Sequence, residues 1–193
     1  MLTKKTMATA VTATVLTGSV LGLGMVSFSA PTQAASQSAA ASETTNPRAA
    51  EILNELYNTA FKGEMPQDIE GLKLNKSTQS DVYNKIGEPE KKADAGNRFD
   101  LYSSNMGNPG YGFSYNKDNT ISQIRYFGTG VERQQNLGGI TPAVLSEQIG
   151  SADQILTVPH TNETDYVYFT GDYELHFVIG SDQTADHVNL KAR

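Results

Sequence analysis

A short pattern that occurs twice in the chain constrains the fold more than any other feature. The segments 78–87 and 141–150 both begin with Thr and end with Ile-Gly, 63 residues apart. Thr is favourable just before the first turn of a helix, and Gly is favourable just after the last turn. Each segment also carries apolar residues on one helical face. The pattern therefore predicts two short helices in corresponding positions of two related units.

Strands are predicted after each of these helices, again at corresponding positions. Phe113 and Ile124 match Phe177 and Val188 at a common offset of 64 residues. Alternation of apolar and polar residues around these positions predicts antiparallel strands with one buried face. A pattern that recurs in this way indicates an internal duplication.

The predicted organisation is a single α+β domain over residues 47–193. An amphipathic helix over residues 47–62 comes first, because apolar residues recur there at helical spacing behind an initial Pro. Two tandem helix-plus-antiparallel-sheet units follow, at about residues 71–127 and 139–193. The helices are expected to pack on one face of the sheet, which leaves the opposite face open to solvent.

The expected open face carries polar, charged and aromatic side chains, a mixture that suits a recognition surface. Because no catalytic motif accompanies these side chains, we predict that they bind a ligand. The residues assigned to this surface are Gln123, Arg125, Phe127, His176, His187 and Lys191.

The first segment of the chain is typical of an export signal. Lys4 and Lys5 precede an uncharged, largely apolar stretch over residues 7–30, and small residues follow it. This order predicts a secretory signal peptide over residues 1–34, cleaved after Ala34 or nearby, and then a flexible leader over residues 35–46. The alternative is an uncleaved membrane anchor, since the apolar stretch is long enough to span a bilayer.

Composition narrows the class of protein further. The chain has no Cys, which excludes disulfides, thiolate metal sites and a Cys nucleophile. Its formal net charge of −6 argues against a nucleic-acid partner, because such proteins usually present a basic face. An exported chain without Cys fits a secreted or cell-wall-associated bacterial protein with no stable membrane insertion after cleavage.

Three residues of the second predicted unit have side chains that can bind metals: Glu174, His176 and His187. They could in principle form a three-ligand site, but scattered histidines on a solvated strand face are the favoured interpretation. The chain has no Gly-x-Ser-x-Gly motif for a nucleophilic serine. Acidic loops at Asp118 and Asp182 fit turns better than calcium sites. No catalytic residue, metal or cofactor is predicted.

The segment Asp81-Val82-Tyr83-Asn84-Lys85-Ile86-Gly87-Glu88-Pro89, a helix followed by Gly-x-Pro and then a hairpin, resembles the β-lactamase-inhibitor-like architecture. That architecture consists of tandem helix-plus-sheet units. Over residues 47–193 the chain resembles the secreted Bacillus YjgB-like family, whose function is unknown. The second unit has Ala152 where the first has Pro89. The resemblance implies a fold and transfers no functional residue.

The function predicted from these features is that of a secreted, non-catalytic binding protein. It would recognise a protein or an envelope component of unknown identity through the open sheet face. Two alternatives stay open at this point. One is a cell-envelope hydrolase with a cleft between the two units, and the other is a structural component of the extracellular matrix or spore surface.

Overall fold

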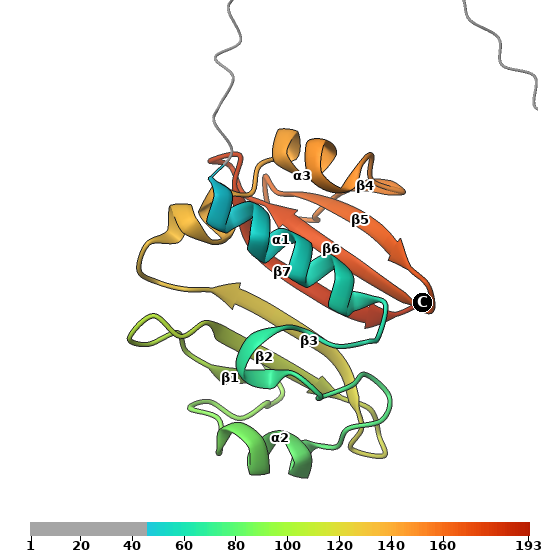
Figure 1. The fold of residues 1–193 in the computed structure, drawn as a ribbon. Coiled ribbons are helices and arrows are strands. Elements are labelled where there is room, and N and C mark those ends of the chain that lie inside the picture. Colours follow the sequence, from blue (N-terminus) through green and yellow to red (C-terminus); the bar gives the residue numbers. More distant parts are fainter. Residues whose placement is uncertain (1–45) are drawn as a thin grey trace, which may run out of the picture. The chain divides into compact units, whose positions relative to one another are not determined.

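Seven strands form one antiparallel sheet in the computed structural model, which describes residues 46–193 (Figure 1). The strand order is β1-β2-β3-β7-β6-β5-β4. The predicted signal peptide and all but the last residue of the predicted leader lie outside the described residues. The strands are β1 (Asp100–Tyr102), β2 (Gly110–Tyr115), β3 (Ile121–Gly128), β4 (Gln154–Thr157), β5 (Thr164–Thr170), β6 (Tyr173–Ile179) and β7 (Ala185–Ala192).

The helices pack against one side of this sheet, and α1 crosses in front of it in Figure 1. The chain therefore has an α+β fold in which the sheet is the larger part. The α-helices are α1 (Pro47–Ala60), α2 (Gln79–Ile86) and α3 (Pro142–Ile149), and the short 3₁₀ helices are η1 (Gln67–Ile69), η2 (Arg133–Gln135) and η3 (Leu137–Gly139). Within residues 46–193, no helix is long and apolar enough to cross a membrane.

Helices α2 and α3 begin and end as their sequences predict. Thr78 accepts a hydrogen bond from the backbone N–H of Asp81, whose carboxylate accepts one in return from the N–H of Thr78. Thr141 caps α3 in the same way through the N–H of Val144. Both helices end at a glycine with a φ of 85°, at Gly87 and Gly150, a conformation that favours Gly.

Helix α1 is held at its start and along one face. The side chain of Asn46 accepts a hydrogen bond from the N–H of Arg48 at 3.0 Å. The helix ends at Ala60, two residues before the predicted end. The residues it buries recur at the three- and four-residue spacing of an amphipathic helix; they are Ala49, Ile52, Leu53, Leu56 and Ala60.

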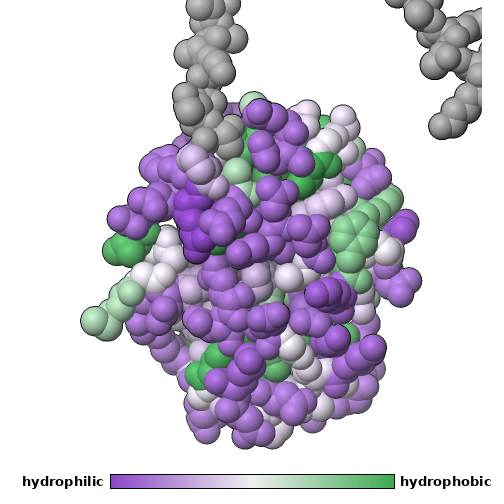
Figure 2. Space-filling view, in the orientation of Figure 1, coloured by the Kyte–Doolittle hydropathy of each residue, from purple (hydrophilic) through white to green (hydrophobic). Residues whose placement is uncertain are grey.

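The core fills the space between the helices and the sheet, as the strand alternation predicts. The residues related by the 64-residue offset form equivalent cross-strand pairs in the two halves of the sheet. Phe113 lies opposite Ile124, and Phe177 lies opposite Val188. All four side chains are fully buried on the helix side. Figure 2 shows the outer surface of this side, which is mainly hydrophilic with separate hydrophobic patches.

One buried acid ties α2 to the edge of the sheet. The carboxylate of Asp100, at the start of β1, accepts hydrogen bonds from Gln79 Nε2 at 3.0 Å, Tyr83 Oη at 2.9 Å and the backbone N–H of Ala93 at 2.7 Å. Burial and this hydrogen bond raise the pKa of Tyr83 to about 12, so its hydroxyl keeps its proton and donates. Asp100 therefore joins the start of β1 to helix α2 and to the backbone at Ala93.

Candidate functional site

The six residues predicted to bind a ligand lie on one face of three neighbouring strands. Strand β3 supplies Gln123, Arg125 and Phe127, while β7 supplies His187 and Lys191, and β6 supplies His176. They lie on the face of the sheet opposite the core residues, because they alternate with those residues along each strand. We call this face, opposite the helices, the polar face.

The polar face is less open than its sequence predicts. Gln123 and His176 are 9% and 5% exposed, and the other four predicted residues are half-buried. The reason is that neighbouring polar side chains lie against one another and form hydrogen bonds across the strands. Four of the six residues, Gln123, Arg125, His176 and Lys191, belong to two such networks.

The first network is centred on Asn189 of β7, which lies directly opposite Arg125. The side-chain oxygen of Asn189 accepts one hydrogen bond from Gln123 Nε2 at 2.9 Å and another from Arg125 Nε at 2.8 Å. Asn189 is only 8% exposed. Gln123 therefore has a structural partner, and Arg125 is fixed at one of its nitrogen atoms.

The second network surrounds His176. Its Nδ1 lies 2.7 Å from a carboxylate oxygen of Asp165, and its Nε2 lies 3.2 Å from one of Glu174. Lys191 Nζ lies 3.1 Å from the same Glu174 oxygen. Burial alone would raise the pKa of Glu174, but the contacts with Lys191 and His176 bring it below its ordinary value. His176 and Lys191 thus have acidic partners within the protein.

His187 stands apart from that network. Its Nδ1 lies 2.8 Å from a carboxylate oxygen of Asp186, and its ring lies 6.2 Å from the ring of Phe127. Across residues 46–193, no group of three His, Cys, Asp or Glu side chains is arranged to hold a metal ion. The structure therefore does not bring Glu174, His176 and His187 together as ligands.

Two aromatic rings enclose the guanidinium group of Arg125. Its central carbon lies 4.6 Å from the ring centre of Phe99 and 5.9 Å from that of Phe127. The guanidinium of Arg98 lies 5.4 Å from the same Phe99 ring. We call Arg98, Phe99, Arg125 and Phe127 the arginine cluster. Neither arginine forms an ion pair with any residue that the structure describes.

Gly112 of β2 makes the arginine cluster possible. It lies directly opposite Arg125 on β3. A Cβ atom at this position would lie 3.3 Å from the Phe99 ring and 3.5 Å from Cβ of Arg125. The missing side chain leaves the space in which Phe99 lies against the sheet beside Arg125, so Phe99 is only 5% exposed.

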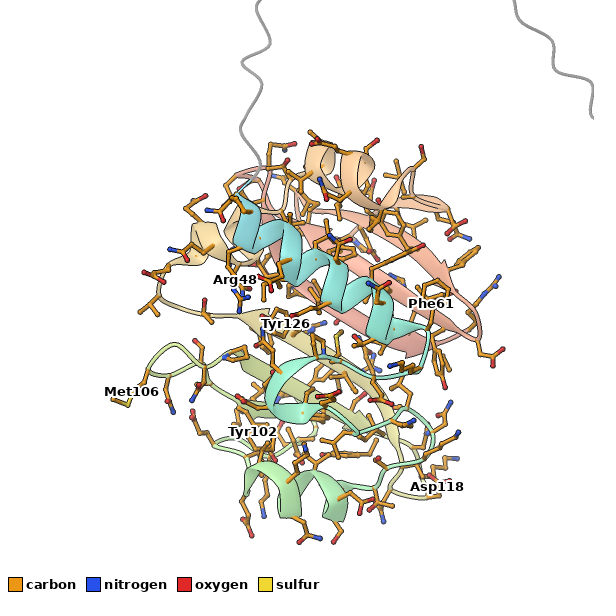
Figure 3. All side chains as sticks on the ribbon, viewed as in Figure 1. Arg48, Phe61, Tyr102, Met106, Asp118 and Tyr126 are labelled. Carbon is orange, nitrogen blue, oxygen red and sulfur yellow. The ribbon has the colours of Figure 1, made fainter. Side chains whose placement is uncertain are left out.

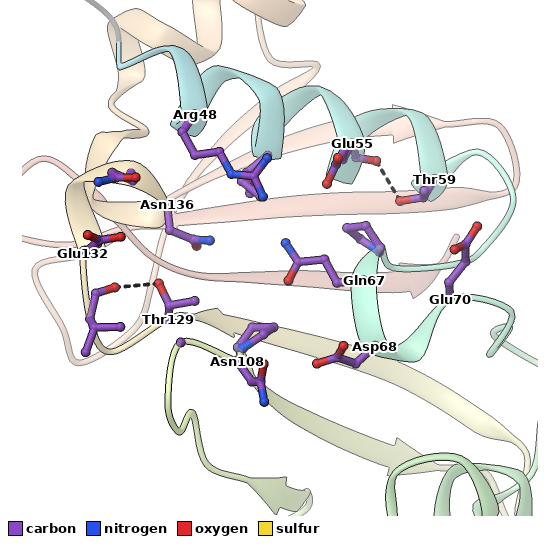
Figure 4. A pocket seen from close by; sticks show the side chains of 16 residues that line it. Arg48, Glu55, Thr59, Gln67, Asp68, Glu70, Asn108, Thr129, Glu132 and Asn136 are labelled. Atoms are coloured by element: carbon purple, nitrogen blue, oxygen red, sulfur yellow. Dashed lines mark hydrogen bonds between the residues drawn. The ribbon is translucent and has the colours of Figure 1, made fainter.

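A groove lies on the other side of the sheet (Figure 4). It has a volume of 640 Å³ and is bounded by α1, η1, the loop between β1 and β2, and η2. Met106, 99% exposed, stands at the tip of that loop and points away from the protein (Figure 3). The lining contains no Ser, Cys or His, and its charged residues are Arg48, Glu55, Asp68, Glu70 and Glu132.

Comparison with known proteins identifies the family. The model of DUF4309, a domain of unknown function, matches residues 53–191. The chain belongs to the DUF4309 family. It is 63% identical over 190 residues to the uncharacterized protein YjgB of Bacillus subtilis strain 168, which covers 98% of this chain and 100% of the relative. The resemblance to the YjgB-like family is thereby confirmed.

One solved structure agrees with this assignment. The crystal structure of YjgB from Bacillus subtilis, a DUF4309 family protein, matches with a TM-score of 0.75 and 68% identity, covering 77% of this chain and 100% of that one. An extracellular SCP-domain protein from Bacillus anthracis matches with a TM-score of 0.42 and 9% identity, over 66% of this chain and 48% of that one. The latter score is too low to establish a common fold.

Several residues and contacts described above could not be predicted from the sequence. Arg98 and Phe99 precede β1 in a segment without strand alternation, so nothing assigns them to a face. Asn189 is recognisable as a residue of the polar face, but its role as a double acceptor depends on strand register. The groove of the DUF4309 domain was also missed, because its lining comes from segments that lie far apart in the sequence.

We expect the stability of the DUF4309 domain to depend on pH through His187. Burial and, further off, the charge of Arg125 lower the pKa of His187 below its ordinary 6.5. As the pH falls through 6.5, the unfolded chain therefore binds a proton before the folded protein does, and stability decreases. His187→Phe should reduce the loss of stability between about pH 7.5 and about pH 5.5, measured by urea unfolding. An unchanged loss would show that His187 titrates alike in both states.

Proposed function

We propose that the protein is exported and acts outside the cell or on its wall as a non-catalytic binding domain. A protein or an envelope component docks on the polar face, around Arg125. The observation that carries this proposal is the state of Arg125, which is half-buried and held in place yet has no acidic partner among residues 46–193. An arginine desolvated in this way usually has a partner, either within the protein or in a complex.

The other polar residues of this face support a binding role over catalysis. Gln123, His176 and Lys191 are joined to neighbouring side chains, which fixes the surface around Arg125 rather than presenting a reactive group. The groove on the opposite side has no Ser, Cys or His in its lining, and the hydroxyls of its two threonines, Thr59 and Thr129, donate to backbone carbonyl oxygens rather than to a base. A surface whose side chains are held in place, and on which Arg125 has no acidic partner, is suited to recognition.

Export is supported by the order of residues at the N-terminus. Two lysines, an uncharged apolar stretch and a run of small residues follow one another there, as in a secretory signal peptide. The absence of Cys agrees with a bacterial protein that folds outside the cell without disulfides.

We also infer that the two halves of the sheet arose by duplication, in tandem units like those of the β-lactamase-inhibitor-like architecture. In support, α2 and α3 have the same length, the same Thr cap and the same terminal Gly. At the junction of the halves, Arg125 pairs with Asn189, its counterpart at the 64-residue offset. The arginine cluster would then lie beside the axis that relates the two units, where duplicated positions have diverged.

Co-sedimentation with a cell-wall fraction of Bacillus subtilis, the source of both YjgB comparisons, tests the proposed function. The wild-type protein should pellet with the walls, and Arg125→Ala should lower the bound fraction about tenfold. Lys117→Ala is the matched control, because it removes one positive charge from an exposed turn away from the polar face. Thermal melts of each variant establish that it is folded.

Two outcomes would contradict the proposed function. One is wild-type protein that stays in the supernatant in the presence of walls and of wall-attached proteins. The other is a folded Arg125→Ala protein that pellets as well as Lys117→Ala does. Trypsin treatment of the walls before mixing then separates a protein partner from a wall polymer.

A further inference from the structure

The orientation of the Arg125 guanidinium is determined on three sides. Its Nε–H donates to Asn189, whose oxygen is itself fixed by Gln123. The rings of Phe99 and Phe127 lie near the guanidinium, at 4.6 and 5.9 Å from its central carbon. Arginine has five N–H donors, and this arrangement uses one of them. The N–H groups on the two Nη atoms have no acceptor in the part of the chain that the structure describes.

The charges around Arg125 do not neutralise the positive charge at its two Nη groups. Arg98 lies on the same Phe99 ring and has the same sign of charge. Burial first and the charge of Arg98 second lower the pKa of Arg125. The acids that act on it most, Asp186 and Glu163, form their own contacts, to His187 at 2.8 Å and to Thr161 at 3.0 Å.

This placement is unusual for a protein with an excess of acidic residues. The chain has 21 Asp and Glu against 15 Lys and Arg, so an arginine without an acid beside it is not the expected arrangement. Two guanidinium groups sharing one ring repel each other, and that of Arg125 is also partly desolvated, which costs free energy. The attraction of a bound anion would offset both costs. Departures of this kind from local rules are found most often at functional sites.

We propose that the arginine cluster is a receptor for an oxyanion, a carboxylate or phosphate group carried by the ligand of the polar face. The two Nη groups of Arg125 match two oxygen atoms of such a group, in the paired geometry that arginine forms with carboxylates and phosphates. Arg98, exposed at the edge of the site, adds a second positive charge. This inference rests on the proposed function and specifies the chemistry that the polar face recognises.

The rigidity of the cluster explains why an oxyanion would bind here rather than at an exposed lysine. Arg125 loses little side-chain freedom on binding, because Asn189 and the two rings already hold it. The half-buried position also weakens screening by water and salt compared with a fully exposed cation. Gly112 leaves the space that the Phe99 ring occupies. A larger residue at position 112 should therefore disturb the site without removing a charge.

The test is a titration of the purified full chain with inorganic phosphate and, separately, with succinate, at constant ionic strength set by chloride. Binding is followed through the ¹H–¹⁵N resonances of the arginine Nε–H groups. The Nε–H signal of Arg125 should shift saturably with at least one of the two anions. Arg125→Lys keeps a positive charge but loses the paired donors, so its affinity should fall about tenfold. Arg98→Gln, at an exposed position, should weaken binding by a smaller factor, about threefold.

The outcomes separate this inference from the proposed function. A linear response that chloride reproduces, or equal affinity in Arg125→Lys, would show general screening only and overturn the oxyanion receptor. If wall binding nevertheless depends on Arg125, the proposed function stands and the anion chemistry is wrong. If phosphate or succinate binds at Arg125 but walls and their proteins do not, the receptor stands and the proposed partner class is wrong. A preference for phosphate over succinate identifies which oxyanion the ligand carries.

Discussion

Asp100→Ala is expected to lower the free energy of unfolding by about 3 kcal/mol. The carboxylate is fully buried and accepts three hydrogen bonds, from Gln79, Tyr83 and the backbone N–H of Ala93. Its removal leaves these donors without an acceptor and opens a gap beneath α2. Urea unfolding followed by circular dichroism measures the loss, with an unchanged slope if the denatured state is unaffected.

Asp94→Ala is the matched control for this variant. Asp94 is exposed in the preceding turn and also accepts hydrogen bonds from backbone N–H groups, those of Gly96 and Asn97. Water can replace its carboxylate, so the unfolding midpoint should move far less than in Asp100→Ala. Tyr83→Phe, which deletes one donor to Asp100, should cost about 1 kcal/mol. Equal midpoints for the two aspartate variants would show that Asp100 does not hold α2 to the sheet.

Local patterns in the sequence predict the elements of this fold well. The caps at Thr78 and Thr141, and the glycines that end α2 and α3, act over a few residues, so the sequence specifies them directly. Strand alternation likewise predicts which residues face the core, because successive side chains point to opposite sides of a strand. Phe113 is correctly assigned to the buried face on this basis.

Contacts between distant segments are not predictable by the same means. Alternation places Arg125 on the polar face, but only strand register brings Asn189 opposite it and only Gly112 makes room for Phe99. Arg98 and Phe99 lie outside any regular strand, so their position depends on how the chain enters β1. The polar face lies opposite the helices as expected, but its side chains are less exposed than the alternation suggests, because neighbouring side chains cover one another.

Gly139→Ala is expected to destabilise the protein by about 3 kcal/mol, which corresponds to a fall in melting temperature of about 10 °C for a domain of this size. Gly139 ends η3, where the chain passes beneath the first turn of α1. A Cβ atom there would overlap the backbone carbonyl oxygen of Gln134 and lie 2.6 Å from Cβ of Ala49. Neither neighbour is the end of a flexible side chain, so α1 or the 3₁₀ segment must move. Differential scanning calorimetry measures the effect.

Two companion variants identify the cause. Gly96→Ala adds the same methyl group to an exposed turn, where its nearest neighbour would be Asp94 Oδ1 at 3.5 Å, and it should melt within about 2 °C of the wild type. Ala49→Gly alone should cost about 1 kcal/mol, because glycine weakens a helix. Combined with Gly139→Ala it removes one of the two overlaps, so the double variant should be more stable than the sum of the single effects predicts. Strict additivity, or a Gly139→Ala protein that melts like Gly96→Ala, would mean that α1 is not seated against η3 as closely as the structure places it.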